Sequence, residues 1–283
     1  MRPRAATRSP GCECHRSATL AGLTGSRDDA MVRAMSEAYF ADKPARPPVQ
    51  RLWTEAISAV RPVPRHVVQA AMRAAPLGDS HPVLVVPAFL RSDGYTILLR
   101  RFLADRGYAV TGWRLGVNVG PTETVLAGIE RRLDELTDRH GRKASLVGHS
   151  LGGAIARELA KKRPDQVRLL ITLASPIRLP TASPLEPVYQ LLSRWHSPSM
   201  RGLYAELNEP PSVPVTAIHT RSDGIVAWQS CLEAPGPRRE NIEVAGPHST
   251  MARNPAAWRI IADRLAQPEG RWQPFGAEAD PSA

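Results

Sequence analysis

The chain has 283 residues, of which 42% are apolar, and a formal net charge of +10. This length suffices for one hydrophobic core of ordinary domain size, with segments left over at both ends. No run approaches the roughly 20 apolar residues that a membrane-spanning helix needs. The three cysteines are too few for a disulfide framework and favour a reducing compartment. We therefore expect a globular, cytoplasmic protein.

The positive charge comes mostly from arginines that are scattered along the chain. A basic surface can bind nucleic acid or an anionic membrane. However, no aromatic residues are interleaved with the arginines, as a base-stacking surface would require. We expect a solvated basic surface and no nucleic-acid partner, with weak peripheral membrane contact as the alternative. The sequence leaves the oligomeric state open.

The two ends of the chain differ from its middle. Residues 1–30 are rich in Arg, Ser, Thr and Gly and have no apolar periodicity, which predicts a disordered basic tail without a secretory signal. The run Cys12-Glu13-Cys14-His15 has the residue types of a metal site. No second cluster follows it at zinc-like spacing, so we expect no metal. Residues 271–283 form a second, C-terminal tail.

Between the tails, the chain divides into a short extension and a larger domain. Residues 31–78 follow a helical pattern broken by prolines, which predicts short outer helices that carry no chemistry. Residues 79–270 begin with a buried-strand pattern at 82–87. Further strands are predicted at 107–113, 144–147, 169–174, 213–220 and 241–244, and helices at 95–105, 122–140, 151–162 and 255–267. This alternation predicts an α/β fold in which helices cover both faces of a mainly parallel sheet.

The most informative motif lies at residues 146–153, which read Leu-Val-Gly-His-Ser-Leu-Gly-Gly. They contain a G-x-S-x-G pattern around Ser150, between a predicted strand and a predicted helix. A serine in this setting occupies a strained turn that exposes its hydroxyl above the sheet edge. Gly148 and Gly152 lack the Cβ that would collide with the neighbouring strand or helix. The motif predicts a nucleophilic serine.

Two candidate partners for this serine follow late predicted strands, where an open parallel sheet binds its ligands. Asp223 follows strand 213–220, and His248 follows strand 241–244. A serine hydroxyl is a poor nucleophile, so an imidazole must take its proton and a carboxylate must orient that imidazole. Among eight histidines, His248 alone lies in a loop after the last predicted strand. Asp93 and Glu243 compete for the acid role, but Asp223 has the better position.

An acyl-transfer site also needs backbone donors for the oxyanion of the tetrahedral intermediate. One candidate is the N–H of Leu151, directly after the nucleophile. The other is the N–H of Phe89, in the loop after the first core strand, and the Phe89 side chain could line an acyl pocket. For Phe89, simple core packing is the competing interpretation.

Several of these runs together resemble the α/β-hydrolase superfamily, particularly its lipase- and esterase-like bacterial members. The runs are 83–89, 148–153, 164–167, 222–226 and 247–248. The resemblance covers about residues 80–270 and implies a Ser/Asp/His hydrolase without a metal or organic cofactor. One departure is Pro87-Ala88, because many relatives have a glycine before the oxyanion residue and alanine is less free at positive φ.

A lid is expected at about 176–212, between the strands at 169–174 and 213–220. Its apolar residues recur at helical spacing and include Leu185, Val188, Leu192 and Trp195. A small helical lid over the substrate pocket and one more core helix fit this stripe equally well.

Taken together, the motifs predict hydrolysis of a small-molecule ester with an apolar acyl group, through an acyl-serine intermediate. Transfer of the acyl group to an alcohol is one alternative, and a non-catalytic binding domain on the same fold is another.

Overall fold

The computed structural model describes residues 44–178, 182–185, 187, 188, 191 and 209–276. The predicted tail at 1–30, the last seven residues of the chain, and the proposed lid residues Leu192 and Trp195 lie outside this set. No helix among the described residues is long and apolar enough to cross a membrane.

The centre of the molecule is a six-stranded sheet in the order β2-β1-β3-β4-β5-β6, and every neighbouring pair is parallel. The strands are β1 (Pro82–Val86), β2 (Ala109–Gly112), β3 (Ala144–His149), β4 (Val167–Leu173), β5 (Val215–His219) and β6 (Arg239–Glu243). The predicted α/β fold with its mainly parallel sheet is confirmed. The chain runs from β1 to one side for β2 and returns past β1 for β3. Ligands of open α/β sheets bind at such a reversal, beyond the carboxyl ends of the strands.

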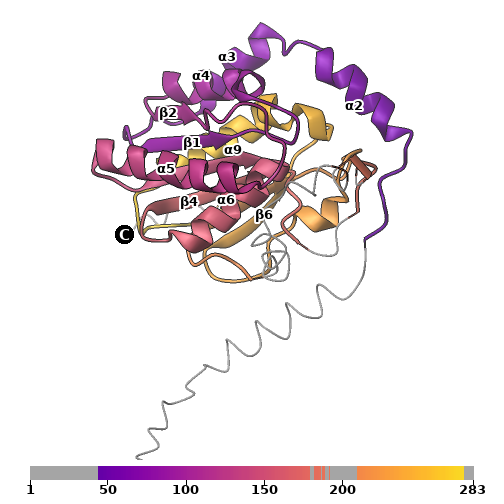
Figure 1. The fold of residues 1–283 in the computed structure, drawn as a ribbon. Coiled ribbons are helices and arrows are strands. Elements are labelled where there is room, and N and C mark those ends of the chain that lie inside the picture. The colour runs from indigo at the N-terminus through magenta and orange to yellow at the C-terminus, as the bar shows by residue number, and fades with distance from the viewer. Residues whose placement is uncertain (1–43, 179–181, 186, 189–190, 192–208, 277–283) are drawn as a thin grey trace, which may run out of the picture.

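Helices cover both faces of the sheet (Figure 1). Along β1, Val83 and Val85 enter one hydrophobic core, whereas Leu84 and Val86 enter the other. This alternation follows from the two-residue period of a strand. One core contains residues of α3 (Arg65–Ala74), α4 (Ile97–Asp105) and α9 (Pro255–Ala266), and the other contains residues of α5 (Glu123–His140) and α6 (Leu151–Lys162). Three short 3-10 helices, η1 (Asp93–Thr96), η2 (Trp228–Cys231) and η3 (His248–Arg253), complete the described elements.

The helix ends have local causes in the sequence. The Thr122 side chain accepts a hydrogen bond from the backbone N–H of Val125, which satisfies a donor at the start of α5. Gly141 ends the same helix at φ 59°, a left-handed conformation that glycine adopts without steric cost. The predicted end of this helix is therefore confirmed.

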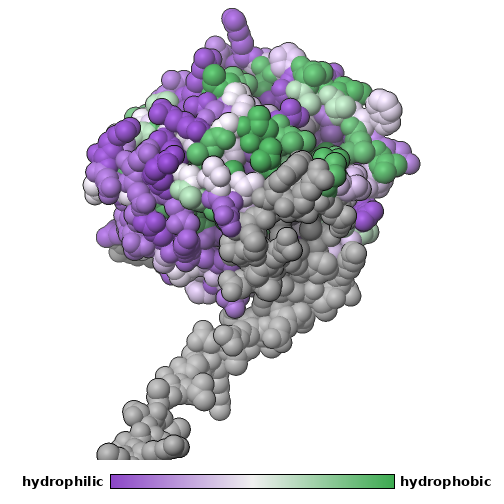
Figure 2. Space-filling view, in the orientation of Figure 1, coloured by the Kyte–Doolittle hydropathy of each residue, from purple (hydrophilic) through white to green (hydrophobic). Residues whose placement is uncertain are grey.

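The N-terminal extension forms α2 (Arg51–Val60) and α3, as short helices outside the sheet. Several apolar residues of α2 are exposed to solvent: Trp53 is 75% exposed and Val60 is 81% exposed, whereas Leu52 is half-buried. Figure 2 shows hydrophobic surface gathered over this helix. The one buried residue of α2 is Glu55. Polar contacts, more than apolar burial, therefore hold α2 on the domain.

Candidate active site

Ser150 lies on a strained turn between β3 and α6. Its φ is 53° and its ψ is −128°, a conformation that costs free energy for any residue with a Cβ. The surrounding chain holds this strain, because the Ser150 N–H donates to the carbonyl of Leu173 at 2.8 Å and the Ser150 carbonyl accepts from Gly153 at 2.9 Å. The turn is thus fixed by the end of β4 on one side and by the start of α6 on the other.

The two glycines of the motif allow this close approach. A Cβ on Gly152 would lie 2.3 Å from the carbonyl oxygen of Pro87, at the end of β1. A Cβ on Gly148 would lie 2.4 Å from the Cα of Gly153. Both obstacles are backbone atoms, which cannot rotate away as a side chain can. The steric role predicted for the glycines is therefore confirmed.

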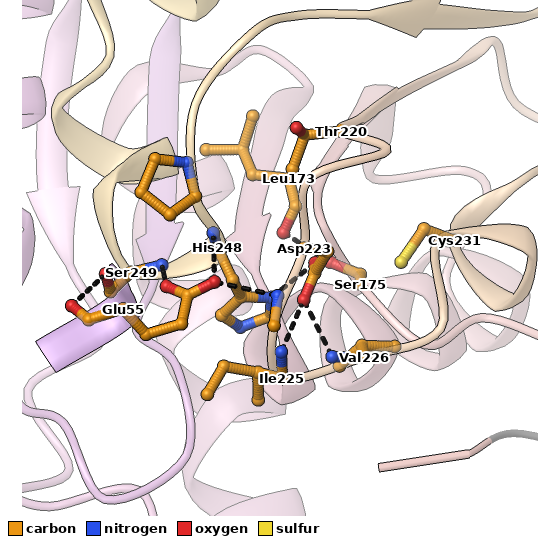
Figure 3. Close-up of polar contacts among 12 residues, drawn as sticks. Glu55, Leu173, Ser175, Thr220, Asp223, Ile225, Val226, Cys231, His248 and Ser249 are labelled. Carbon is orange, nitrogen blue, oxygen red and sulfur yellow. Dashed lines mark hydrogen bonds and ion pairs between the residues drawn. The ribbon is translucent and has the colours of Figure 1, made fainter. Parts of the chain in front are cut away.

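Asp223 and His248 form a buried hydrogen-bonded pair beyond the ends of β5 and β6 (Figure 3). His248 Nδ1 donates to Asp223 Oδ2 at 2.7 Å, and both side chains are almost fully buried. The other carboxylate oxygen of Asp223 accepts from the backbone N–H groups of Ile225 at 2.8 Å and Val226 at 2.7 Å. With these three contacts, the carboxylate fixes the imidazole tautomer in which Nε2 is free to take a proton.

The charge environment of His248 favours the imidazolium. Burial alone would lower the pKa of His248, but the charge and hydrogen bond of Asp223 and the charge of Glu55 raise it above its usual value. A base with a raised pKa accepts a proton readily, and it is blocked when the pH falls below that pKa.

The two competing carboxylates have other partners. Asp93 accepts from the backbone N–H groups of Trp113 at 3.1 Å and Arg114 at 3.0 Å, and so holds the end of β2. Glu243 forms an ion pair with Arg221 at 3.0 Å on the surface. Of the three carboxylates weighed in the sequence, only Asp223 is bonded to His248.

His149 and Tyr95 support the backbone of the His248 loop. His149 is neutral, because burial and the neighbouring His248 lower its pKa well below its usual value, and its Nε2–H donates to the His248 carbonyl at 3.1 Å. The Tyr95 ring is stacked on His149 with 5.5 Å between centroids, and its hydroxyl donates to the Ser249 carbonyl at 2.8 Å. The sequence motif places His149 beside Ser150 but did not predict its contact with the His248 loop.

The loop after β1 carries the expected oxyanion donor at Phe89. Buried Asn118 fixes this loop, since its amide donates to the Pro87 carbonyl at 2.8 Å and its backbone carbonyl accepts from Leu90 at 2.7 Å. The positive φ in the loop is at Leu90, at 57°, and Ala88 is not among the residues with positive φ. The substitution of alanine for glycine at position 88 therefore introduces no backbone strain of this kind.

The sequence also matches a family model. The model described as serine aminopeptidase, S33, matches residues 102–226, a span that contains Ser150 and Asp223. The match agrees with the fold and with the motif at Ser150. The chain therefore has the α/β-hydrolase fold. No curated protein matches the sequence closely enough to be counted.

Solved structures of lipolytic enzymes share the α/β-hydrolase fold of this chain. One is described under the metagenome-derived lipolytic enzymes LipS and LipT, with 19% identity, a TM-score of 0.52, and coverage of 67% of this chain and 93% of that one. Lipase B of Aspergillus fumigatus has 15% identity and a TM-score of 0.51, and the match covers 72% of this chain and 58% of that one. The Bacillus licheniformis lipase BlEst2 has 14% identity and a TM-score of 0.51, and the match covers 68% of this chain and 94% of that one. At these identities, the likeness concerns the fold alone.

One residue of the extension reaches the candidate active site. The carboxylate of Glu55 in α2 accepts from the backbone N–H groups of Gly224 at 2.8 Å, His248 at 2.9 Å and Ser249 at 2.7 Å (Figure 3). The expectation that the extension carries no chemistry overlooked this contact. One feature of the sequence could have indicated this contact: Glu55 is the only carboxylate between residues 44 and 78.

The described part of the expected lid is partly helical, and it is buried at Ile177 and Ala182 but exposed farther along. Residues 187, 188 and 191 are helical, and Leu185 is 37% and Val188 43% exposed. The lid and the core helix both stay predictions. What the segment covers depends on residues 192–208, which lie outside the described set.

No group of three or more His, Cys, Asp or Glu side chains in the described ranges could hold a metal ion. The cysteines at positions 12 and 14 lie outside these ranges. Cys231 is buried, and burial and the nearby Asp223 raise the pKa of its thiol well above the usual value. This thiol is therefore not an alternative nucleophile.

Proposed function

We propose that this protein is a serine ester hydrolase, with Ser150 as nucleophile, His248 as general base and acid, and Asp223 as the residue that orients the imidazole. The observation that carries the proposal is the hydrogen-bonded Asp223–His248 pair, whose chain order after a strained serine turn is that of an α/β-hydrolase triad.

In the proposed reaction, His248 Nε2 takes the Ser150 hydroxyl proton as the serine oxygen attacks the ester carbonyl carbon. The N–H groups of Leu151 and Phe89 are the proposed donors to the resulting oxyanion. Collapse of the tetrahedral intermediate expels the alcohol, which receives the proton from His248. Water then attacks the acyl-serine by the same route, and the acid is released.

The proposed substrate is a small ester with an apolar acyl group. Phe89 beside the oxyanion position, and the apolar residues Leu185 and Val188, would supply surface for an acyl chain, with Leu192 and Trp195 as further candidates. Burial of each methylene contributes about 0.8 kcal/mol. If an alcohol replaces water in the second half of the reaction, the same residues perform acyl transfer. This remains the second candidate.

The test is Ser150→Ala. We expect this variant to lose fluorophosphonate labelling and to lose p-nitrophenyl ester hydrolysis by about 10⁶-fold in kcat, because the members of a triad act as a unit. His248→Ala should be nearly as severe, and the double variant no worse. Circular dichroism should show an unchanged fold.

Two controls separate the alternatives. Labelling that persists in Ser150→Ala would remove the nucleophile assignment. An aminoacyl p-nitroanilide tests the amide cleavage that the family description names, and product analysis with an added alcohol separates hydrolysis from acyl transfer. A wild-type protein that is neither labelled nor active on any of these substrates would favour the non-catalytic binding domain.

A further inference from the structure

We infer that Glu55, from outside the hydrolase core, is a positioning residue that holds the two loops of the proposed triad together and places a negative charge next to His248. This inference rests on the proposed function. The span matched by the family model begins after α2, so Glu55 lies outside it.

One oxygen of Glu55 joins the two loops that carry the acid and the base. Glu55 Oε1 accepts from Gly224, next to Asp223, and from the backbone of His248 itself. The relative position of the two loops decides whether the carboxylate and the imidazole meet. A shared acceptor fixes that position more tightly than two separate contacts would, because neither loop can move without losing a hydrogen bond in a buried site.

Glu55 also caps the short helix that begins at His248. The first N–H groups of a helix have no partner within it, and η3 receives no capping hydrogen bond from Pro247, the residue before it. Glu55 satisfies the N–H of His248 with one oxygen and that of Ser249 with the other. Ser249 returns a hydrogen bond, from its hydroxyl to the Glu55 carbonyl at 2.9 Å.

The rest of α2 is fastened to the same loops. Arg51 donates to the carbonyls of Arg221 at 2.8 Å and Asp223 at 3.2 Å. At the other end of the helix, Arg253 donates to the Ser58 carbonyl. A Cβ on Gly224 would lie 2.9 Å from the Cβ of Arg51 and from the Cγ of Glu55, so the glycine allows this approach. These contacts fix α2 against the two loops, and Glu55 is only 4% exposed there.

A buried carboxylate at this place acts on the imidazole by its charge. The groups that face His248 are Asp223 from the β5–η2 loop, Glu55 from α2, and neutral His149 at 4.9 Å between ring centroids. Both carboxylates favour the imidazolium, and the imidazolium is the form that His248 takes in the transition state. Removing the charge of Glu55 should therefore lower the pKa of His248 and also slow the reaction at high pH.

The experiment uses the full-length chain with Glu55→Gln, Glu55→Asp and the surface control Glu243→Gln. Two quantities are measured against pH: the rate of fluorophosphonate labelling, and the titration of His248 by NMR in histidine-labelled protein. We expect Glu55→Gln to move both midpoints to lower pH by about half a unit or more and to lower the plateau rate about tenfold. Glu243→Gln should match the wild type in both.

The Glu55→Asp variant separates the effect of the negative charge from the effect of the hydrogen bonds, which depend on side-chain length. Its carboxylate keeps the charge but is one methylene shorter, so we expect a slower plateau with a midpoint close to that of the wild type. This variant also carries the test if thermal melting shows that Glu55→Gln does not fold. A wild-type midpoint and rate in Glu55→Gln, or a wild-type rate in Glu55→Asp, would overturn the inference. The NMR titration of His248 remains informative even if the wild type shows no hydrolysis, so failure of the proposed function is distinguishable.

Discussion

The turn at Ser150 and the contact of α2 with the His248 loop serve the same site, but they are built in opposite ways. The turn is marked by a short local motif, with glycines on both sides of the serine and a strand and helix directly attached, and it packs closely against the backbone of Pro87 and Leu173. The α2 contact joins Glu55 to residues 169 to 194 positions away, through hydrogen bonds to backbone N–H groups. The comparison suggests that the turn cannot change without loss of the fold, whereas the α2 contact can be weakened while the fold is kept.

The largest effect should come from Gly152→Ala, which breaks the turn. The added methyl group would meet the Pro87 carbonyl, so we expect a loss of at least about 2 kcal/mol in unfolding free energy and a large loss of labelling. Gly94→Ala is the matched control, because its nearest contact would be an ordinary 3.9 Å to the Ser92 side chain. Chemical denaturation measures both variants. Equal stability of the two would mean that the turn adapts and that its glycines are not required.

A smaller effect should come from Arg51→Leu, which weakens the α2 contact and leaves Glu55 in place. The loss of its two hydrogen bonds should lower the unfolding free energy by about 1 kcal/mol and slow labelling a few-fold. Arg61→Leu, an exposed arginine directly after the same helix, is the control and should change neither quantity. A labelling rate for Arg51→Leu as low as that of Glu55→Gln would mean that anchoring of α2, and not the Glu55 charge, limits the reaction.

The smallest effect concerns substrate choice, and it comes from the expected lid, which is part of neither the Ser150 turn nor the α2 contact. We expect kcat/KM for p-nitrophenyl esters to rise over the first few added methylenes, because each buried methylene contributes about 0.8 kcal/mol. Val188→Asp should flatten this rise without abolishing acetate hydrolysis, and Leu192→Asp should do the same. A wild-type preference for acetate, or an equal loss on all esters, would show that this segment does not contact the acyl chain.

The sequence alone determined the parallel α/β sheet and most element positions, because these depend on hydrophobic periodicity. The motif around Ser150 also predicted the steric need for Gly148 and Gly152, although the obstacle at Gly152 is the distant Pro87 carbonyl. It also proposed Ser150, Asp223 and His248 from their places after strands. Only the tertiary structure assigned Asp93 and Glu243 to other partners, located the positive φ at Leu90, and brought Glu55 against both loops. The contacts of Asp93 and Glu55 join a side chain to distant backbone N–H groups. Since every non-proline residue carries the same N–H, they leave no pattern in the sequence.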